Sequence, residues 1–394
     1  MENTSPRTIA VAGLLALAVA MGIGRFAFTP LLPLMAREGQ LDLAWGGWIA
    51  AANYVGYFVG ALTAARLPLG ARGLAVVGLV LTAASTAAMA APSLALWIGL
   101  RFVAGVASAW VFVATSLWCL GALARTARGE LGGLVYAGVG GGIALTGLYC
   151  VAAAGMDLGA ATLWIHLGVL SALLAVPVLA VLARLAPVPA GAAAVANEAD
   201  GGDTLGLVVC YGLMGFGYIL PATFLPALAR TVVDDPRLFG LAWPVFGAMA
   251  AASTLLAGWW MRRASRLHVW AVSQLLMGVG VLLPSVVLNG ATIALSALLV
   301  GGTFMVITLA GVQEMRARAA PGAAVRLVGR ITAAFALGQI AGPVASALLL
   351  HTPAFREHGL ALALQAGAAG LLASGAWLWR RAHPATSTKE TLHA

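Results

Sequence analysis

Two arginines lie within long apolar stretches of the sequence, where a permanent positive charge is costly. Arg25 lies in the segment MGIGRFAFTPLLP (21–33), and Arg101 lies seven residues into the apolar run that begins at Leu94. A guanidinium keeps its proton in proteins, and its planar fork of donors matches a carboxylate with two parallel hydrogen bonds. The chemistry that these two residues offer is therefore recognition of an anion.

No acidic residue is placed in the sequence to neutralise either arginine. None of the 13 aspartates and glutamates lies deep within an apolar run; Glu130 and Glu314 lie at the ends of such runs, next to Arg128 and Arg316. A charge at the centre of a bilayer costs at least about 2.5–3.5 kcal/mol on insertion scales. Two interpretations follow. The arginines bind an anionic substrate, or they bond to backbone carbonyls at Gly- and Pro-disturbed helices and only brace the fold.

The elements that must position these residues are membrane-spanning helices. Of the 394 residues, 61% are hydrophobic and 9% are charged, and the mean hydropathy is +0.97. A soluble domain carries about 25% charged residues, so this composition excludes a water-soluble protein. Apolar runs of roughly 20 residues, each long enough to cross a bilayer as a helix, recur along the chain. We predict an all-α membrane protein whose twelve spans are 8–35, 45–65, 73–91, 94–122, 131–154, 160–183, 206–230, 239–261, 268–288, 291–315, 325–350 and 359–380.

The basic residues predict that both termini lie in the cytoplasm. With that orientation, sixteen of the 22 lysines and arginines fall in cytoplasmic segments and four in outer segments, as the positive-inside rule requires. The net charge of +9 is then a topology signal and does not indicate a nucleic-acid partner. The three cysteines form no motif, so we expect neither a metal site nor a cofactor.

A polar segment at 185–205 divides the chain into two related halves. It predicts a cytoplasmic linker between a six-helix bundle at 1–184 and a second at 206–394. Residues 13–37 match residues 206–230 without a gap, and Gly13, Met21, Gly22, Gly24, Pro33 and Arg37 recur as Gly206, Met214, Gly215, Gly217, Pro226 and Arg230. In this alignment Tyr218 corresponds to Arg25, so the second half forms its equivalent helix without the charge.

Two six-span halves joined by a cytoplasmic linker resemble the major facilitator superfamily. GIGRFAFTPLLPLM (22–35) and GQIAGP (338–343) most resemble its bacterial YbfB/YjiJ group, and RFVAG (101–105) resembles its fourth-helix arginine motif. The loop at 60–72 resembles its gating loop but lacks the usual acidic residue, whereas 258–266 keeps the glycine and the arginines. The resemblance implies a monomeric secondary transporter of the bacterial inner membrane. Its substrate would bind near the bilayer midplane between the halves, and transport would proceed by alternating access.

Helical spacing extends the candidate site beyond the two arginines. One half would supply charge and the other aromatic surface, which suits a small organic anion with an apolar body, such as a monocarboxylate. The residues expected to contact substrate are Arg25, Arg101, Asn53, Tyr57, Ser108, Tyr211, Tyr218, Trp243, Phe335 and Gln339. Those expected to bend helices or to gate are Gly22, Gly24, Pro30, Gly140, Gly141, Gly342 and Pro343.

Other functions are compatible with parts of this pattern. An exporter of apolar or amphipathic compounds or lipids on the same fold is the main alternative, and a receptor or sensor built on a transporter fold is another. An enzyme is not expected, because the chain has no HExxH motif and no motif surrounds Ser108 or His166. Because the spans contain no deep carboxylate, uniport, anion exchange and symport of substrate with its own proton all stay open.

Overall fold

The apolar runs form long helices, because a chain in lipid must satisfy its backbone hydrogen bonds internally. The structure is a computed structural model. It describes residues 4–383 except 42, 155, 157, 185–201, 231, 233–235, 321–322 and 355–357. The helices are α1 (Pro6–Leu17), the π-helix η1 (Ala18–Ile23), α2 (Phe28–Arg37), α3 (Leu43–Thr63), α4 (Gly70–Ala88), α5 (Leu94–Arg125), the 3-10 helix η2 (Gly129–Leu131), α6 (Gly132–Ala154), α7 (Ala160–Arg184), α8 (Gly202–Arg230), α9 (Pro236–Trp260), α10 (Arg266–Val286), α11 (Gly290–Arg318), α12 (Ala324–His351) and α13 (Gly359–Ala382).

Each of the twelve predicted spans coincides with one helical segment of the described residues. The first span corresponds to the run from α1 through η1 to α2, and the boundaries differ by at most four residues. Ten of these segments are long and apolar enough to cross a membrane by length and composition; α3 and α9 fall outside that set among the described residues. The predicted linker lies mostly at 185–201, outside the described residues, and α8 begins at Gly202. The division into two domains therefore stays a prediction.

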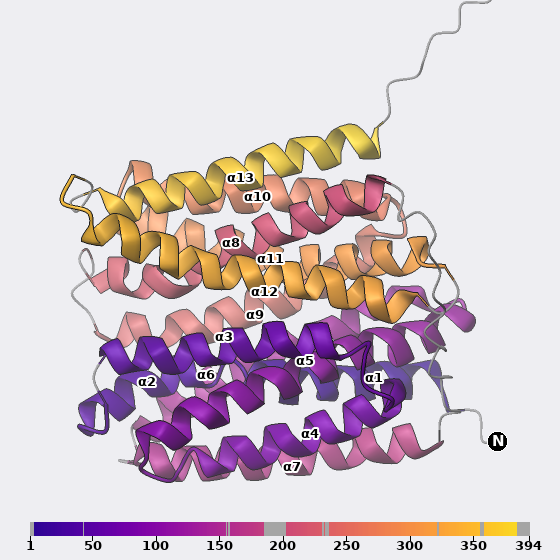
Figure 1. The fold of residues 1–394 in the computed structure, drawn as a ribbon, viewed down its shortest axis with the longest axis horizontal. Helices are drawn as coiled ribbons and strands as arrows, with labels where there is room; N and C mark the ends of the chain where they lie inside the picture. Colours follow the sequence, from indigo (N-terminus) through magenta and orange to yellow (C-terminus); the bar gives the residue numbers. More distant parts are fainter. Residues whose placement is uncertain are drawn as a thin grey trace, which may run out of the picture.

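The helices of the two predicted halves occupy different sides of the bundle. In Figure 1, α1–α7 lie in the lower part of the view and α8–α13 in the upper part. Helix α3 packs against α12 and α6 packs against α9, so these two pairs join the groups. Helix α1 begins and α13 ends at the same end of the bundle, on the right of the view.

The first span is broken at its centre, although the sequence predicts it as one helix. The π-helix η1 has the wide hydrogen bond from Gly24 N to Val19 O (2.8 Å), and residues 24–27 form a turn before α2 begins. Pro30, in the first turn of α2, has no N–H to donate. Such π-turns occur frequently at functional sites, and this one places Arg25 in the turn.

Helices α6 and α9 touch backbone to backbone along one glycine seam. Gly133, Gly140 and Gly147 on α6 are spaced seven residues apart and face α9. A Cβ atom at Gly133 would lie 2.5 Å from Thr254 O, and one at Gly140 would lie 2.3 Å from Ala251 N. Small residues allow this approach between helices that have no hydrophobic force to join them in lipid.

We predict that Gly140→Ala destabilises the protein and that Gly141→Ala does not. A methyl group at Gly140 meets the backbone of α9, whereas one at Gly141 has no atom within 4 Å. Overpacking against backbone costs about 1–3 kcal/mol, while Ala in place of Gly in a helix interior favours folding by roughly 0.5–1 kcal/mol. Thermal unfolding in detergent measures both variants. Equal melting temperatures for the two would show that the seam does not hold the halves together.

Candidate functional site

Arg25 is buried at the centre of the bundle and faces aromatic rings. Its side chain is 2% exposed, and its guanidinium carbon lies 3.8 Å from the centroid of the Tyr57 ring. The rings of Phe26, Tyr54 and Phe335 lie 5.4, 5.8 and 5.8 Å away. A desolvated cation over an aromatic face gains about 2 kcal/mol or more, so the rings offset part of the cost of burying this charge.

One polar contact joins Arg25 to the other side of the bundle. Its Nη2 donates to Oε1 of Gln339 on α12. Because arginine has no acceptor, this contact fixes the amide orientation of Gln339, with Nε2 left as a donor. Among the described residues, Nε and Nη1 of Arg25 and Nε2 of Gln339 have no hydrogen-bond partner, and no carboxylate binds Arg25.

The carboxylates of the described helix ends have other partners. Glu314 binds Arg266 at 2.9 Å and Arg318 at 2.8 Å. The sequence places Arg316 next to Glu314, but the structure brings these two other arginines to it. Glu38 accepts a hydrogen bond from Ala160 N at 2.8 Å, at the start of α7. These acids lie at helix ends and not beside the buried arginines.

Arg101 on α5 braces the broken first span. Its Nη1 and Nη2 donate to the carbonyl oxygens of Gly24 at 2.7 Å and Arg25 at 2.6 Å. The amide of Asn53 donates in turn to Arg101 O at 2.9 Å. Both terminal nitrogens of this guanidinium are thus used on the turn that holds Arg25, which is the bracing arrangement weighed for this residue. Its Nε has no hydrogen-bond partner among the described residues, and contact of Arg101 with substrate stays a prediction.

A column of stacked rings lies beside Arg25. Trp243 stacks on Phe246 at 5.4 Å, Phe246 on Phe304 at 5.3 Å, and Phe304 on Tyr218 at 4.8 Å, with interplanar angles of 4–21°. Tyr218 also stacks on Phe335 at 6.1 Å. Among the described residues, the buried Trp243 Nε1 and Tyr218 Oη have no hydrogen-bond partner. The column therefore adds two further unpartnered groups that can donate.

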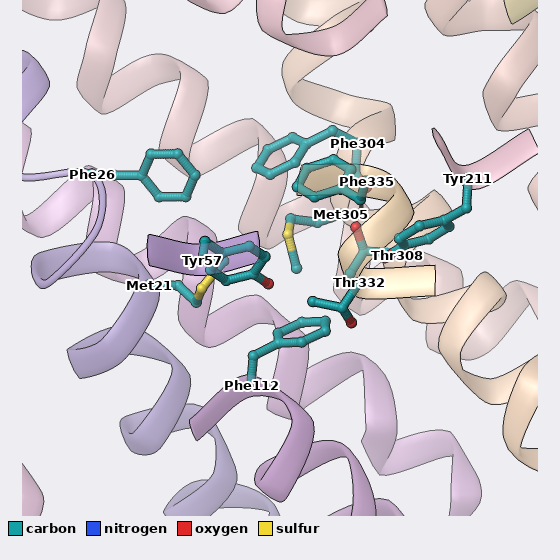
Figure 2. Close-up of a pocket in the computed structure, with 10 residues that line it drawn as sticks. All are labelled: Met21, Phe26, Tyr57, Phe112, Tyr211, Phe304, Met305, Thr308, Thr332 and Phe335. Atoms are coloured by element: carbon teal, nitrogen blue, oxygen red, sulfur yellow. Dashed lines mark hydrogen bonds between the residues drawn. The ribbon is translucent and has the colours of Figure 1, made fainter. Parts of the chain in front are cut away.

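A small cavity of ≈ 10 Å³ lies between the two sides, which is space for about one water. Figure 2 shows that its walls come from helices of both predicted halves. Its lining residues are mostly aromatic or sulfur-containing: Met21, Phe26, Tyr57, Phe112, Tyr211, Phe304, Met305, Thr308, Thr332 and Phe335. In this structure, side chains fill most of the space at this cavity.

The structure brings together most of the residues predicted to contact substrate. Arg25, Tyr57, Phe335 and Gln339 are in direct contact, and the rings of Tyr211, Tyr218 and Trp243 continue from them. Asn53 contacts Arg101 instead of the cavity. Ser108 donates to Gly105 O of its own helix at 2.8 Å and lines no part of the cavity.

The predicted bending residues take different places. Gly22 packs against Gly142, and Gly24 against Thr82. Gly342 on α12 packs against Ile219, next to Pro343 within the same helix. Gly141 is exposed with nothing near it. A role of these residues in gating stays a prediction.

Sequence reasoning missed the threonines and methionines of the cavity. Thr308 lies one helical turn beyond Phe304, and Thr332 lies three residues before Phe335. Residues three or four apart share a helix face, so adding the polar residues one turn from the aromatic residues of these spans would have found both. Met21 was noted only as part of the repeat, because a methionine in an apolar span gives no chemical signal.

Comparisons with known proteins agree with this arrangement. A family model described as "uncharacterised MFS-type transporter YbfB" matches residues 17–378. No curated protein matches the sequence. A crystal structure of the human organic anion transporter MFSD10 (TETRAN) is similar, with a TM-score of 0.76, 16% identity, and coverage of 95% of this chain and 100% of that one. The proton:xylose symporter XylE, bound to 6-bromo-6-deoxy-D-glucose, has a TM-score of 0.73 at 14% identity, with 95% of each chain covered. These similarities confirm the predicted fold.

We predict that Arg101→Gln destabilises the protein more than Arg25→Gln. The first change removes two charge-assisted hydrogen bonds to a buried turn, which is worth roughly 3 kcal/mol. The second removes a buried cation that has one polar partner, and we expect a loss of about 1 kcal/mol or less because desolvation of the charge is relieved. Thermal unfolding of the two variants measures the difference. A larger loss for Arg25→Gln would assign the bracing role to Arg25.

Proposed function

This chain belongs to the YbfB family of MFS-type transporters, and we propose its substrate on that premise. The proposed substrate is a small organic anion, such as a monocarboxylate. The protein is a multi-pass membrane transporter of a small molecule. We propose further that it works as a monomer by alternating access in the bacterial inner membrane, with both termini in the cytoplasm, and that it performs no chemistry on the solute.

The observation that carries the anion proposal is the set of unpartnered donors at the centre. Arg25, Gln339, Tyr218 and Trp243 each have a buried donor group with no acceptor among the described residues. One of the four is a permanent cation. A buried donor without a partner costs about 1–3 kcal/mol, and a solute that brings several acceptors and a negative charge recovers that cost. A carboxylate has two acceptor oxygens and matches two neighbouring nitrogens of a guanidinium, one of which on Arg25 is the Nη2 that Gln339 contacts.

The contact between Arg25 and Gln339 supports alternating access. It crosses from the first span to α12, which belong to different predicted halves. An anion that binds Arg25 competes with the oxygen of Gln339 for the same donors. Substrate binding would then loosen one side of the bundle from the other, which a rocking mechanism requires.

The test is a ligand-dependent thermal-stability screen of the purified full-length protein. Small carboxylates, amino acids, sugars and lipophilic cations are each added to the natural protein, to Arg25→Gln and to Arg184→Gln. Arg184 is an exposed arginine at the end of α7 and serves as the matched control. Ligands that bind only the folded state raise the melting temperature by mass action. We expect carboxylates to stabilise the natural protein and Arg184→Gln but not Arg25→Gln.

Two outcomes would contradict the proposal. If carboxylates have no effect while lipophilic cations or neutral amphiphiles stabilise all three proteins alike, the exporter of apolar compounds is the better function. If carboxylates stabilise Arg25→Gln as well as the natural protein, the anion site lies elsewhere. Uptake of a stabilising carboxylate into proteoliposomes then separates a transporter from a sensor, since a sensor binds without net flux.

We also predict that Gln339→Glu blocks anion binding without unfolding the protein. The change puts a carboxylate of nearly the same shape where the amide oxygen already contacts Arg25, so the protein supplies its own counter-ion. Affinity for carboxylates should fall at least about tenfold, because the guanidinium is already neutralised. Melting temperature and carboxylate titration of the variant measure this. Unchanged affinity would mean that the anion does not use this face of Arg25.

A further inference from the structure

We propose that the substrate is an aromatic carboxylate with a hydrogen-bond donor on the far side of its ring, such as a hydroxybenzoate. This inference rests on the proposed function, because it takes the carboxylate to bind Arg25. It adds the shape and the second polar group of the substrate, which the charge of Arg25 does not determine.

The apolar walls of the cavity are suited to a flat ring. Six of its ten lining residues are aromatic, and they come from the first span, α3, α5, α8, α11 and α12 (Figure 2). Phe304 and Phe335 both line the cavity, and both stack on Tyr218. A planar ring that enters the cavity can pack against such aromatic walls in a stacked geometry, whereas a puckered saturated ring cannot. Offset-stacked pairs are worth more than the area they bury.

The cavity adjoins the guanidinium through shared residues. Tyr57 and Phe335 line the cavity, and the same two rings lie 3.8 and 5.8 Å from the guanidinium carbon of Arg25. Met21 and Phe26, on either side of Arg25 in the chain, also line it. A carboxylate bound at Arg25 therefore directs its substituent toward this cavity.

The polar atoms of the cavity indicate what the second polar group of the substrate is. Thr308 Oγ1 donates to Phe304 O at 2.8 Å, and Thr332 Oγ1 donates to Val328 O at 2.7 Å. Each hydroxyl proton is thus used on the carbonyl one turn back, and the oxygen keeps a lone pair. Tyr57 and Tyr211, whose hydroxyls can donate or accept, also line the cavity. The two threonine oxygens accept hydrogen bonds, so a donor on the ligand finds partners at that end. A phenol hydroxyl is a donor of this kind.

The ligand must enlarge the cavity to enter. A space of ≈ 10 Å³ holds about one water and not a six-membered ring. Five of the ten lining residues lie on α11 or α12, and Phe335 lies one turn before Gln339 on α12. When a carboxylate replaces Gln339 on Arg25, α12 loses its contact with the first span at this point. Helix α12 can then move away from the cavity, which makes room for the ring of the ligand.

The experiment compares matched acids on the full-length protein by thermal shift and by competition for uptake into proteoliposomes. Benzoate, cyclohexanecarboxylate, 4-hydroxybenzoate and the neutral 4-hydroxybenzyl alcohol differ in planarity, in the hydroxyl or in charge. We expect benzoate to bind about threefold to tenfold tighter than cyclohexanecarboxylate, and 4-hydroxybenzoate to bind about threefold to tenfold tighter than benzoate. The neutral alcohol should bind far more weakly than either aromatic acid.

Two threonine variants test the second polar group. Thr332→Val removes one of the two lining threonine hydroxyls with little change of shape, and should reduce the advantage of 4-hydroxybenzoate over benzoate. Thr303→Val is the control, because Thr303 on α11 is also buried and also donates to the carbonyl one turn back, at 2.6 Å from Leu299 O, but does not line the cavity. It should keep the advantage.

The outcomes separate this inference from the proposed function. If aliphatic acids or cyclohexanecarboxylate bind as well as benzoate in an Arg25-dependent way, the aromatic assignment is wrong and the anion transporter stands. If the hydroxyl gives no advantage, or Thr332→Val does not reduce the advantage, the donor assignment is wrong. If no acid of the panel or of the wider carboxylate screen binds, the proposed function fails and this inference fails with it.

Discussion

A guanidinium at the centre of a membrane bundle needs partners on every side, and the structure meets this constraint differently for its two buried arginines. Arg101 uses both terminal nitrogens on backbone carbonyls that the turn after η1 exposes. Arg25, held by that turn, has one amide partner and four aromatic neighbours. The broken helix, the brace and the aromatic surroundings all follow from placing one incompletely bonded cation at this depth. Arg101 holds the turn that carries Arg25. Arg25 keeps unpartnered nitrogens that a solute can bind.

The two halves of the chain have diverged in a way that fits this division. At the equivalent position of the repeat, Tyr218 takes the place of Arg25 and stacks in a column of rings. The first predicted half contributes the cation and three of the six aromatic residues of the cavity, and the second contributes the other three together with Gln339. A site built from two unlike faces is complete only when the halves come together, which links the presence of solute to the relative position of the halves.

The helices could be predicted closely from the sequence because lipid leaves few alternatives to an apolar run of about 20 residues. The identity of Arg25, Tyr57, Phe335 and Gln339 as neighbours was also predictable, since polar residues in such spans face the bundle interior. A bend at this place was expected from Gly22, Gly24 and Pro30, but its form was not, because a π-helix has no sequence signature beyond such small residues. The contacts of Asn53 and Arg101 could be learned only from the structure, since the same residue types could bind a solute or a backbone carbonyl.

The glycine seam between α6 and α9 has a consequence for the permeability of the membrane. A transporter that rocks about its centre exposes its substrate path to each side in turn, and any file of water left beside that path would let protons leak across. Along the seam, backbone lies against backbone at Gly133 and Gly140, with no room even for a methyl group. Two surfaces without interlocking side chains can roll against each other while staying dry. Under the proposed rocking motion, the seam is thus a contact that leaves no room for water at these two glycines.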